Sequence, residues 1–150
     1  MMFRLVRDRR GYSLSFWTSF FTFLLVPMLW MAIGIGRYSI AAAEVQEAAD
    51  LAALAAVRDV NIRQFETSGV VQFTGAAYSR AAAYANMNTD YLASQGIQVH
   101  VVDISANSAT RTVRVRCAAN ISRLFPAIFP EIVVQRTGIA EVRMRVSPQR

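Results

Sequence analysis

The chain has 150 residues, of which 54% are hydrophobic and 17% charged, so it is more apolar than an ordinary soluble domain and long enough for one small domain plus a membrane anchor. Its net charge is +6, but the sixteen arginines that carry the positive charge are scattered, which does not indicate a nucleic-acid groove. The single cysteine, Cys117, excludes an internal disulfide framework and a cysteine-based zinc site.

An uncharged, mostly apolar segment lies between Arg10 and Arg37. As a helix, residues 11–36 would extend about 39 Å, which is enough to cross a bilayer. Helix is the predicted state, because backbone groups in lipid must be hydrogen-bonded within their own segment. Pro27 lies inside the segment and predicts a kink that Ser19, Thr22 or a partner helix accommodates.

The charges that flank this segment predict its orientation. Positive charge precedes it, and acidic residues dominate the stretch after Arg37, so we expect the N-terminus in the cytoplasm. The expected organisation is a cytoplasmic tail at 1–12, a transmembrane helix at 13–36 and an extracytoplasmic α+β domain at 37–150. The residues expected to set this topology are Arg4, Arg7, Arg9 and Arg10.

Three targeting signals are alternatives to a simple anchor. A cleaved signal peptide ending near Ala41–Ala43 is disfavoured, because the apolar run far exceeds the usual length. Arg9 and Arg10 resemble a twin-arginine signal, although a positive-inside anchor accounts for them more simply. The same arginines before Gly11 also resemble a prepilin peptidase site, but Phe16 stands where such a site carries glutamate.

A helix is predicted to continue beyond the membrane to about residue 65, since no glycine or proline occurs between Arg37 and Gly69. One flank of this helix carries only small side chains, which let another backbone approach closely. The opposite flank is acidic and carries larger side chains. A high alanine content can also simply favour helix formation. We call the small-residue flank the alanine face and expect it to be a partner interface; it consists of Val45, Ala48, Ala49, Ala52, Ala53, Ala56 and Val60.

A second alanine-rich helix is predicted at about 74–94, with three tyrosines near its alanines. Two arrangements are open for the alanine face. Either the two helices pack as a hairpin and cover it within the chain, or it is open to a partner.

The pattern changes to a period of two after Gly96, which predicts strands at about 97–105, 111–121 and 131–146, the last with a possible break at Gly138. In the second strand, Val113, Val115 and Cys117 alternate with Arg114 and Arg116. A short antiparallel sheet with helices on one face follows, which makes the fold class α+β. Two prolines indicate a loop at 123–130.

Residues 11–56 combine Gly11 after two arginines, Pro27 in the apolar span, Gly36-Arg37, and the run Gln46-Glu47-Ala48-Ala49-Asp50-Leu51-Ala52-Ala53-Leu54-Ala55. This third of the chain resembles the N-terminal region of TadE/TadG-like proteins of the tight-adherence (Flp) pilus system. The resemblance implies a bitopic component of the bacterial inner membrane, with a periplasmic or extracellular domain, that acts as a minor pilin-like or assembly subunit. The TadG-like side is the closer fit, because the early glutamate of processed pseudopilins is missing.

Longer TadG-like proteins resemble carriers of a von Willebrand A domain with a D-x-S-x-S metal site. Here Asp103 and Ser105 are followed by Asn107 in place of the second serine, and only 47 residues follow Asp103. That length is too short for a doubly wound fold. We therefore expect no metal ligand, and an Asx-type turn at the end of a strand instead.

No convergent set of acid, base and nucleophile is visible, so no enzyme and no cofactor are expected. His100 is predicted on the polar face of a strand, without a triad pattern, and Cys117 on the apolar face.

Two functions remain. The first is a subunit that associates with lipid and with other pilus subunits, as a homo- or hetero-oligomer, through its span and its alanine face. The second is a membrane-anchored binding module with a basic sheet face. Neither requires nucleic acid or a small-molecule substrate. The arginines expected on the basic face are Arg111, Arg114, Arg116, Arg143 and Arg145.

Overall fold

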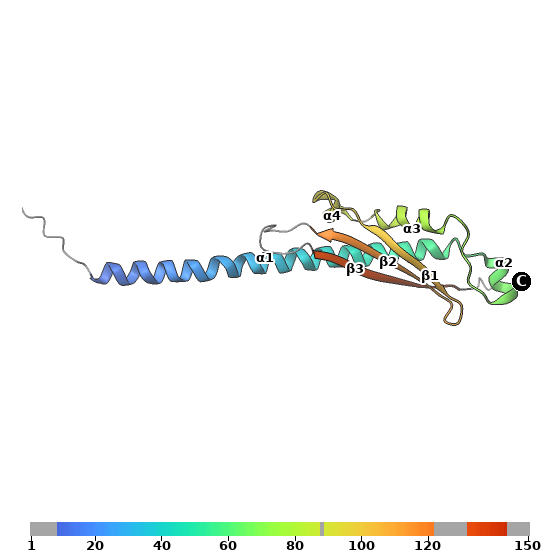
Figure 1. The fold of residues 1–150 in the computed structure, drawn as a ribbon, viewed down its shortest axis with the longest axis horizontal. Helices are drawn as coiled ribbons and strands as arrows, with labels where there is room; N and C mark the ends of the chain where they lie inside the picture. Colours follow the sequence, from blue (N-terminus) through green and yellow to red (C-terminus); the bar gives the residue numbers. More distant parts are fainter. Residues whose placement is uncertain (1–8, 88, 122–131, 144–150) are drawn as a thin grey trace, which may run out of the picture. The chain divides into compact units, whose positions relative to one another are not determined.

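The computed structural model describes residues 9–87, 89–121 and 132–143. A long apolar helix, short helices and a three-stranded antiparallel sheet confirm the α+β class (Figure 1). The chain divides into two compact units, residues 1–37 and 38–150, with the boundary inside the first helix. The elements are α1 (Arg9–Val57), α2 (Ile62–Ser68), α3 (Ala77–Ala85), α4 (Asp90–Ser94), β1 (His100–Asn107), β2 (Thr112–Ile121) and β3 (Ile132–Glu141).

In the first unit, α1 passes through Pro27 without interruption. Proline has no N–H, so the carbonyl of Phe23, four residues earlier, loses its normal helical donor. The hydroxyl of Thr22 donates instead to the carbonyl of Thr18, at 2.8 Å. Thr22 therefore does not compensate for the proline, and the kink at Pro27 stays a prediction. The tail residues Arg4 and Arg7 lie outside the described residues, as do the side chains of Arg9 and Arg10.

The sheet of the second unit has the order β1-β2-β3. Val113, Val115 and Cys117 are fully buried on its inner face, and the alternating arginines of β2 are exposed on its outer face. This alternation is the one that the period-two pattern predicts. β3 continues through Gly138, which pairs with Val115, so the segment is one strand without a break. The loop expected at 123–130 and the strand extension 144–146 lie outside the described residues.

Both helices predicted beyond the membrane are shorter than the sequence suggested. α1 ends at Val57, and α2 begins after Asn61, whose side chain accepts a hydrogen bond from the Gln64 N–H at 3.2 Å. Asn61 is therefore an N-cap that starts a new helix. Between the two helices, the Asn61 N–H donates to the Gln72 carbonyl at 2.8 Å. The expectation of one helix at 74–94 is also wrong, since α3 and α4 are separate.

Candidate interaction surfaces

The alanine face is closed within the chain. Six of its members are at most 1% exposed, and Val60 is 4% exposed. They belong to one core cluster with the inner face of the sheet, including Val115 and Val134. The expected partner interface is thus occupied by the chain's own packing, which leaves these side chains no surface for another protein. The six most buried members are Val45, Ala48, Ala49, Ala52, Ala53 and Ala56.

The sheet covers this face, whereas the two arrangements that the sequence left open were a helical hairpin and an uncovered face. A Cβ atom added at Gly138 would overlap with the backbone of Ala49 and Asp50, so the α1 backbone lies directly on β3. The side-chain amide of Gln46 also donates to the Thr137 carbonyl of β3, at 3.3 Å. Small residues on the helix and a glycine on the strand are what allow this close approach.

Glu44 fixes α4 to α1, a role that the sequence did not reveal. Its carboxylate accepts hydrogen bonds from the backbone N–H groups of Tyr91 and Leu92, at 3.0 and 2.9 Å. These groups lie in the first turn of α4, where they have no partner within the helix. Leu92 is fully buried beside them. Glu44 is therefore a structural residue, although helical periodicity placed it among the acidic residues on the side of the helix opposite the alanine face.

The other side of α1 in this unit is open. It forms a stripe in which exposed residues follow one another at intervals of three and four positions, the spacing of one helical face. Leu54 is 59% exposed and Ile40 49% exposed, and two carboxylates of the same stripe lie between them. We call this stripe the helix flank; it consists of Ile40, Ala43, Glu47, Asp50 and Leu54.

The outer face of the sheet is also open. Arg114 lies between Ser105 of β1 and Ile139 of β3, and Ile139 is 57% exposed. In the next row, Arg116 lies between Asp103 and Thr137. All six residues except Ile139 are polar, and all are exposed. We call this surface the outer sheet face; it consists of Asp103, Ser105, Arg114, Arg116, Thr137 and Ile139.

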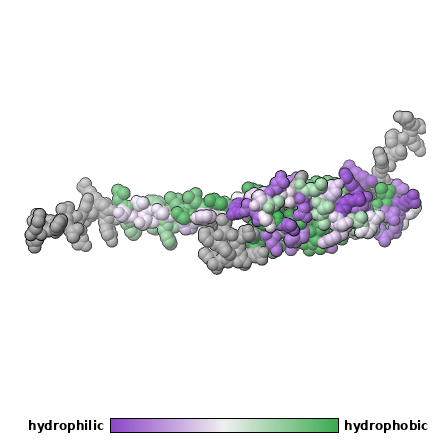
Figure 2. Space-filling model, turned by 90° about the horizontal axis from the view of Figure 1, so that it is seen from above, coloured by the Kyte–Doolittle hydropathy of each residue, from purple (hydrophilic) through white to green (hydrophobic). Residues whose placement is uncertain are grey.

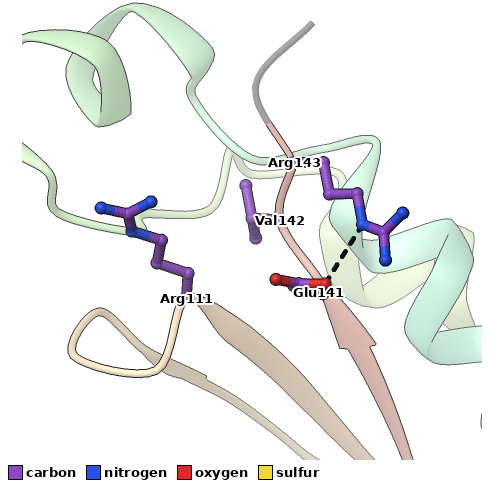
Figure 3. A pocket seen from close by; sticks show the side chains of 4 residues that line it. All are labelled: Arg111, Glu141, Val142 and Arg143. Carbon is purple, nitrogen blue, oxygen red and sulfur yellow. Dashed lines mark hydrogen bonds and ion pairs between the residues drawn. The ribbon is translucent and has the colours of Figure 1, made fainter.

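The remaining arginines of the predicted basic face lie elsewhere. Arg111 and Arg143 line a shallow hollow at one end of the sheet, with Glu141 and Val142. Arg143 pairs with Glu141 at 3.1 Å, and the guanidinium groups of Arg111 and Arg143 point to opposite sides (Figure 3). These two groups therefore do not converge on one anion. Arg145 lies outside the described residues.

The surface of the first unit is apolar over most of its length, unlike the surfaces of the second unit. The part of α1 before Arg37 is long and apolar enough to be a candidate membrane span, and it is not buried. Its surface is green and white in Figure 2, whereas purple, hydrophilic residues are frequent over the second unit. The rings of Phe16, Trp17, Phe20 and Phe21 contact one another along this segment, with centroids 5.8 to 6.4 Å apart.

The residues considered for chemistry do not form a reactive site. His100 and Asp103 are exposed on β1, and no group of potential metal ligands occurs among the described residues. The Asx-type turn is made by Asn107, whose side chain accepts from the N–H groups of Ala109 and Thr110. Cys117 is fully buried, as predicted, and burial raises its pKa from 9.0 to about 11.

The comparison with protein families gives a match that lies largely on α1. The family described as Flp pilus-assembly TadE/G-like matches residues 11–59. Residues 11–59 are therefore similar to the TadE/G-like family, and we call them the TadE/G-like segment. The matched range covers the candidate span and nearly all of the alanine face, which confirms the resemblance over this part of the chain. A comparison with curated proteins found no match, and a comparison with solved structures found none either.

The TadE/G-like segment and the candidate membrane helix together support a membrane component of pilus assembly. The family description names assembly and no reaction. It also suggests other subunits of the pilus system as partners.

Proposed function

We propose that this protein is a membrane-anchored subunit of a Flp-type pilus system, acting as a minor pilin-like or scaffold component through helix–helix association. The observation that carries the proposal is the uncovered apolar surface of α1 within the TadE/G-like segment. Phe23, for example, is 84% exposed and Met31 is 63% exposed. Such a surface needs lipid or another helix around it.

The alanine face takes no part in this association, because the sheet already covers it. The proposed contact lies along the span, at residues 14–36. There, the Phe23 carbonyl that Pro27 deprives of its helical donor gives a partner helix a place to supply a hydrogen bond. The partner is another pilus subunit or a second copy of this chain.

In the proposed topology, the N-terminus is cytoplasmic and the second unit lies outside the inner membrane, by the positive-inside rule. A membrane-impermeant thiol reagent tests this orientation in cells with a permeabilised outer membrane. In a Cys117→Ser background, we expect the reagent to label a cysteine at Glu66→Cys, an exposed position on α2, and not one at Arg7→Cys. The reverse labelling would contradict the topology.

Crosslinking in intact membranes tests the association itself. Single cysteines placed at successive positions from 20 to 35, in chains that lack Cys117, should crosslink to a neighbour every three to four positions. A cysteine at Ala52→Cys is the matched control on the closed face and should not crosslink. Uniformly low crosslinking along the span would contradict the proposal.

The alternative function is a binding module that uses its exposed arginines. If this alternative is correct, Arg114→Glu combined with Arg116→Glu abolishes function. It also predicts that no regular pattern of crosslinks is found along the span, even in the unsubstituted chain. The subunit proposal predicts that the span crosslinks are present, whatever the charge of the sheet. Neither function involves catalysis.

A further inference from the structure

The second unit has two open surfaces on opposite sides. α1 packs on the inner face of the sheet through its alanine face, so the helix flank lies on the far side of α1 and the outer sheet face lies on the far side of the sheet. Both belong to one compact unit. A contact between the flank of one molecule and the sheet of another would therefore join two different surfaces of the same chain.

The two surfaces differ in charge. The middle of the helix flank carries the carboxylates of Glu47 and Asp50, which are exposed but also interact within the chain; the Asp50 carboxylate accepts a hydrogen bond from the Gln46 side-chain amide at 3.1 Å. The middle of the outer sheet face carries the guanidinium groups of Arg114 and Arg116, and no ion pair joins either of them to another described residue. Asp103, the cross-strand neighbour of Arg116, is the one acidic group in these two rows of the sheet.

The spacing of the charges also agrees. Residues 47 and 50 are three apart on a helix, which places their Cβ atoms about 5–6 Å from each other. Residues 114 and 116 are two apart on a strand, which separates them by about 7 Å along the same face. Two carboxylates on the flank can therefore meet two guanidinium groups on the sheet in one docking geometry.

Each surface adds an apolar side chain next to its charges. Leu54 is one helical turn beyond Asp50 and is 59% exposed, and Ile139 lies beside Arg114 and is 57% exposed. Burying an apolar residue next to a charge pair contributes area and lowers the local dielectric around the pair. The flank and the sheet are thus complementary in apolar character as well as in charge.

We propose that the helix flank of one copy of this chain docks on the outer sheet face of the next copy. Glu47 and Asp50 face Arg114 and Arg116, and Leu54 packs beside Ile139. The contact is heterologous, because it uses two different surfaces, and it therefore repeats from copy to copy instead of closing as a two-fold dimer. It rests on the proposed function as an assembling subunit and names both the partner and the surface.

The test uses full-length chains in membranes, all with Cys117→Ser and with two different tags. One chain carries Leu54→Cys and the other carries Ile139→Cys, and the disulfide-linked pair is quantified after mild oxidation. We expect a crosslink between the two chains and none between two Leu54→Cys chains. A crosslink between two Leu54→Cys chains would overturn the heterologous geometry.

Charge reversal then tests the complementarity. Arg114→Glu with Arg116→Glu in the Ile139→Cys chain, or Glu47→Arg with Asp50→Arg in the Leu54→Cys chain, should each lower the crosslink yield about tenfold. When both reversals are combined, one in each chain, the yield should return, because an acidic sheet then meets a basic flank. Glu66→Arg, an exposed reversal on α2, is the control and should leave the yield unchanged.

The outcomes separate this inference from the proposed function. If no charge reversal lowers the crosslink yield, or if combining the two reversals does not restore it, the inference is wrong. If crosslinks along the span persist in those same membranes, the assembly role remains supported. Loss of the span crosslinks would instead contradict the proposed function.

Discussion

The two halves of α1 differ in the size of the apolar side chains that they expose and bury. Before Arg37, the helix exposes large apolar residues such as Phe23 and Met31, and after it the helix buries small ones such as Ala49 and Ala52. Lipid tails solvate large apolar side chains, so these can remain exposed on a span. In the second unit, water drives burial, and methyl-sized side chains bring the sheet close to the helix. The small side chains of α1 therefore form the contact with the chain's own sheet, whereas its exposed surface is formed by large and charged residues.

The largest expected effect comes from enlarging the buried face. Ala49→Leu should destabilise the second unit by about 3 kcal/mol, because the added atoms have no space between α1 and β3. Ala43→Leu, on the exposed flank of the same helix, should change the stability little. Thermal unfolding of the full chain in detergent micelles measures both. Equal stability of the two variants would show that the alanine face is open.

The same contact can be tested from the strand. Gly138→Ala places a Cβ against the backbone of Ala49 and should cost about 2 kcal/mol. Gly75→Ala is the matched control, since a Cβ there meets nothing within 4 Å. Limited proteolysis of the second unit reports the difference, and faster digestion of the Gly75→Ala variant than of the Gly138→Ala variant would contradict the packing described.

A smaller effect is expected where α1 holds α4. Glu44→Ala removes the acceptor for two backbone N–H groups and should destabilise the unit by about 1–2 kcal/mol. Glu66→Ala, an exposed acidic residue on α2, should be close to neutral. Hydrogen exchange at Tyr91 and Leu92 should accelerate only in the Glu44 variant. Unchanged protection there would argue against this contact.

The effect expected at Cys117 is absent near neutral pH and confined to alkaline pH. Its thiol has a raised pKa of about 11 because burial disfavours the thiolate. The folded state keeps this proton above pH 9.0, where the unfolded chain loses it, so stability should fall as the pH rises from 9.0 towards 11. Maleimide labelling at pH 7 should be slow in the folded protein and fast in denaturant. Rapid labelling of the folded chain would contradict the burial.

The local patterns in the sequence were sufficient for much of the fold. Alternation of Val113, Val115 and Cys117 with arginines predicts both faces of β2, and the apolar run predicts the first helix. The covering of the alanine face was not predictable, because it depends on where Gly138, almost ninety residues later, meets Ala49. Glu44 was missed for the same reason, since its partners are backbone N–H groups of a distant segment.

The central claim is that α1 keeps its alanine face for its own sheet and offers other surfaces to its neighbours. It is tested most directly by comparing Ala52→Cys with Glu66→Cys, an exposed position outside both proposed contact surfaces, each in a Cys117→Ser chain in intact membranes. We expect thiol labelling at Glu66→Cys to be at least about a hundredfold faster, because position 52 is fully buried. Comparable labelling at both positions, with crosslinking of Ala52→Cys to a neighbouring subunit, would contradict the claim.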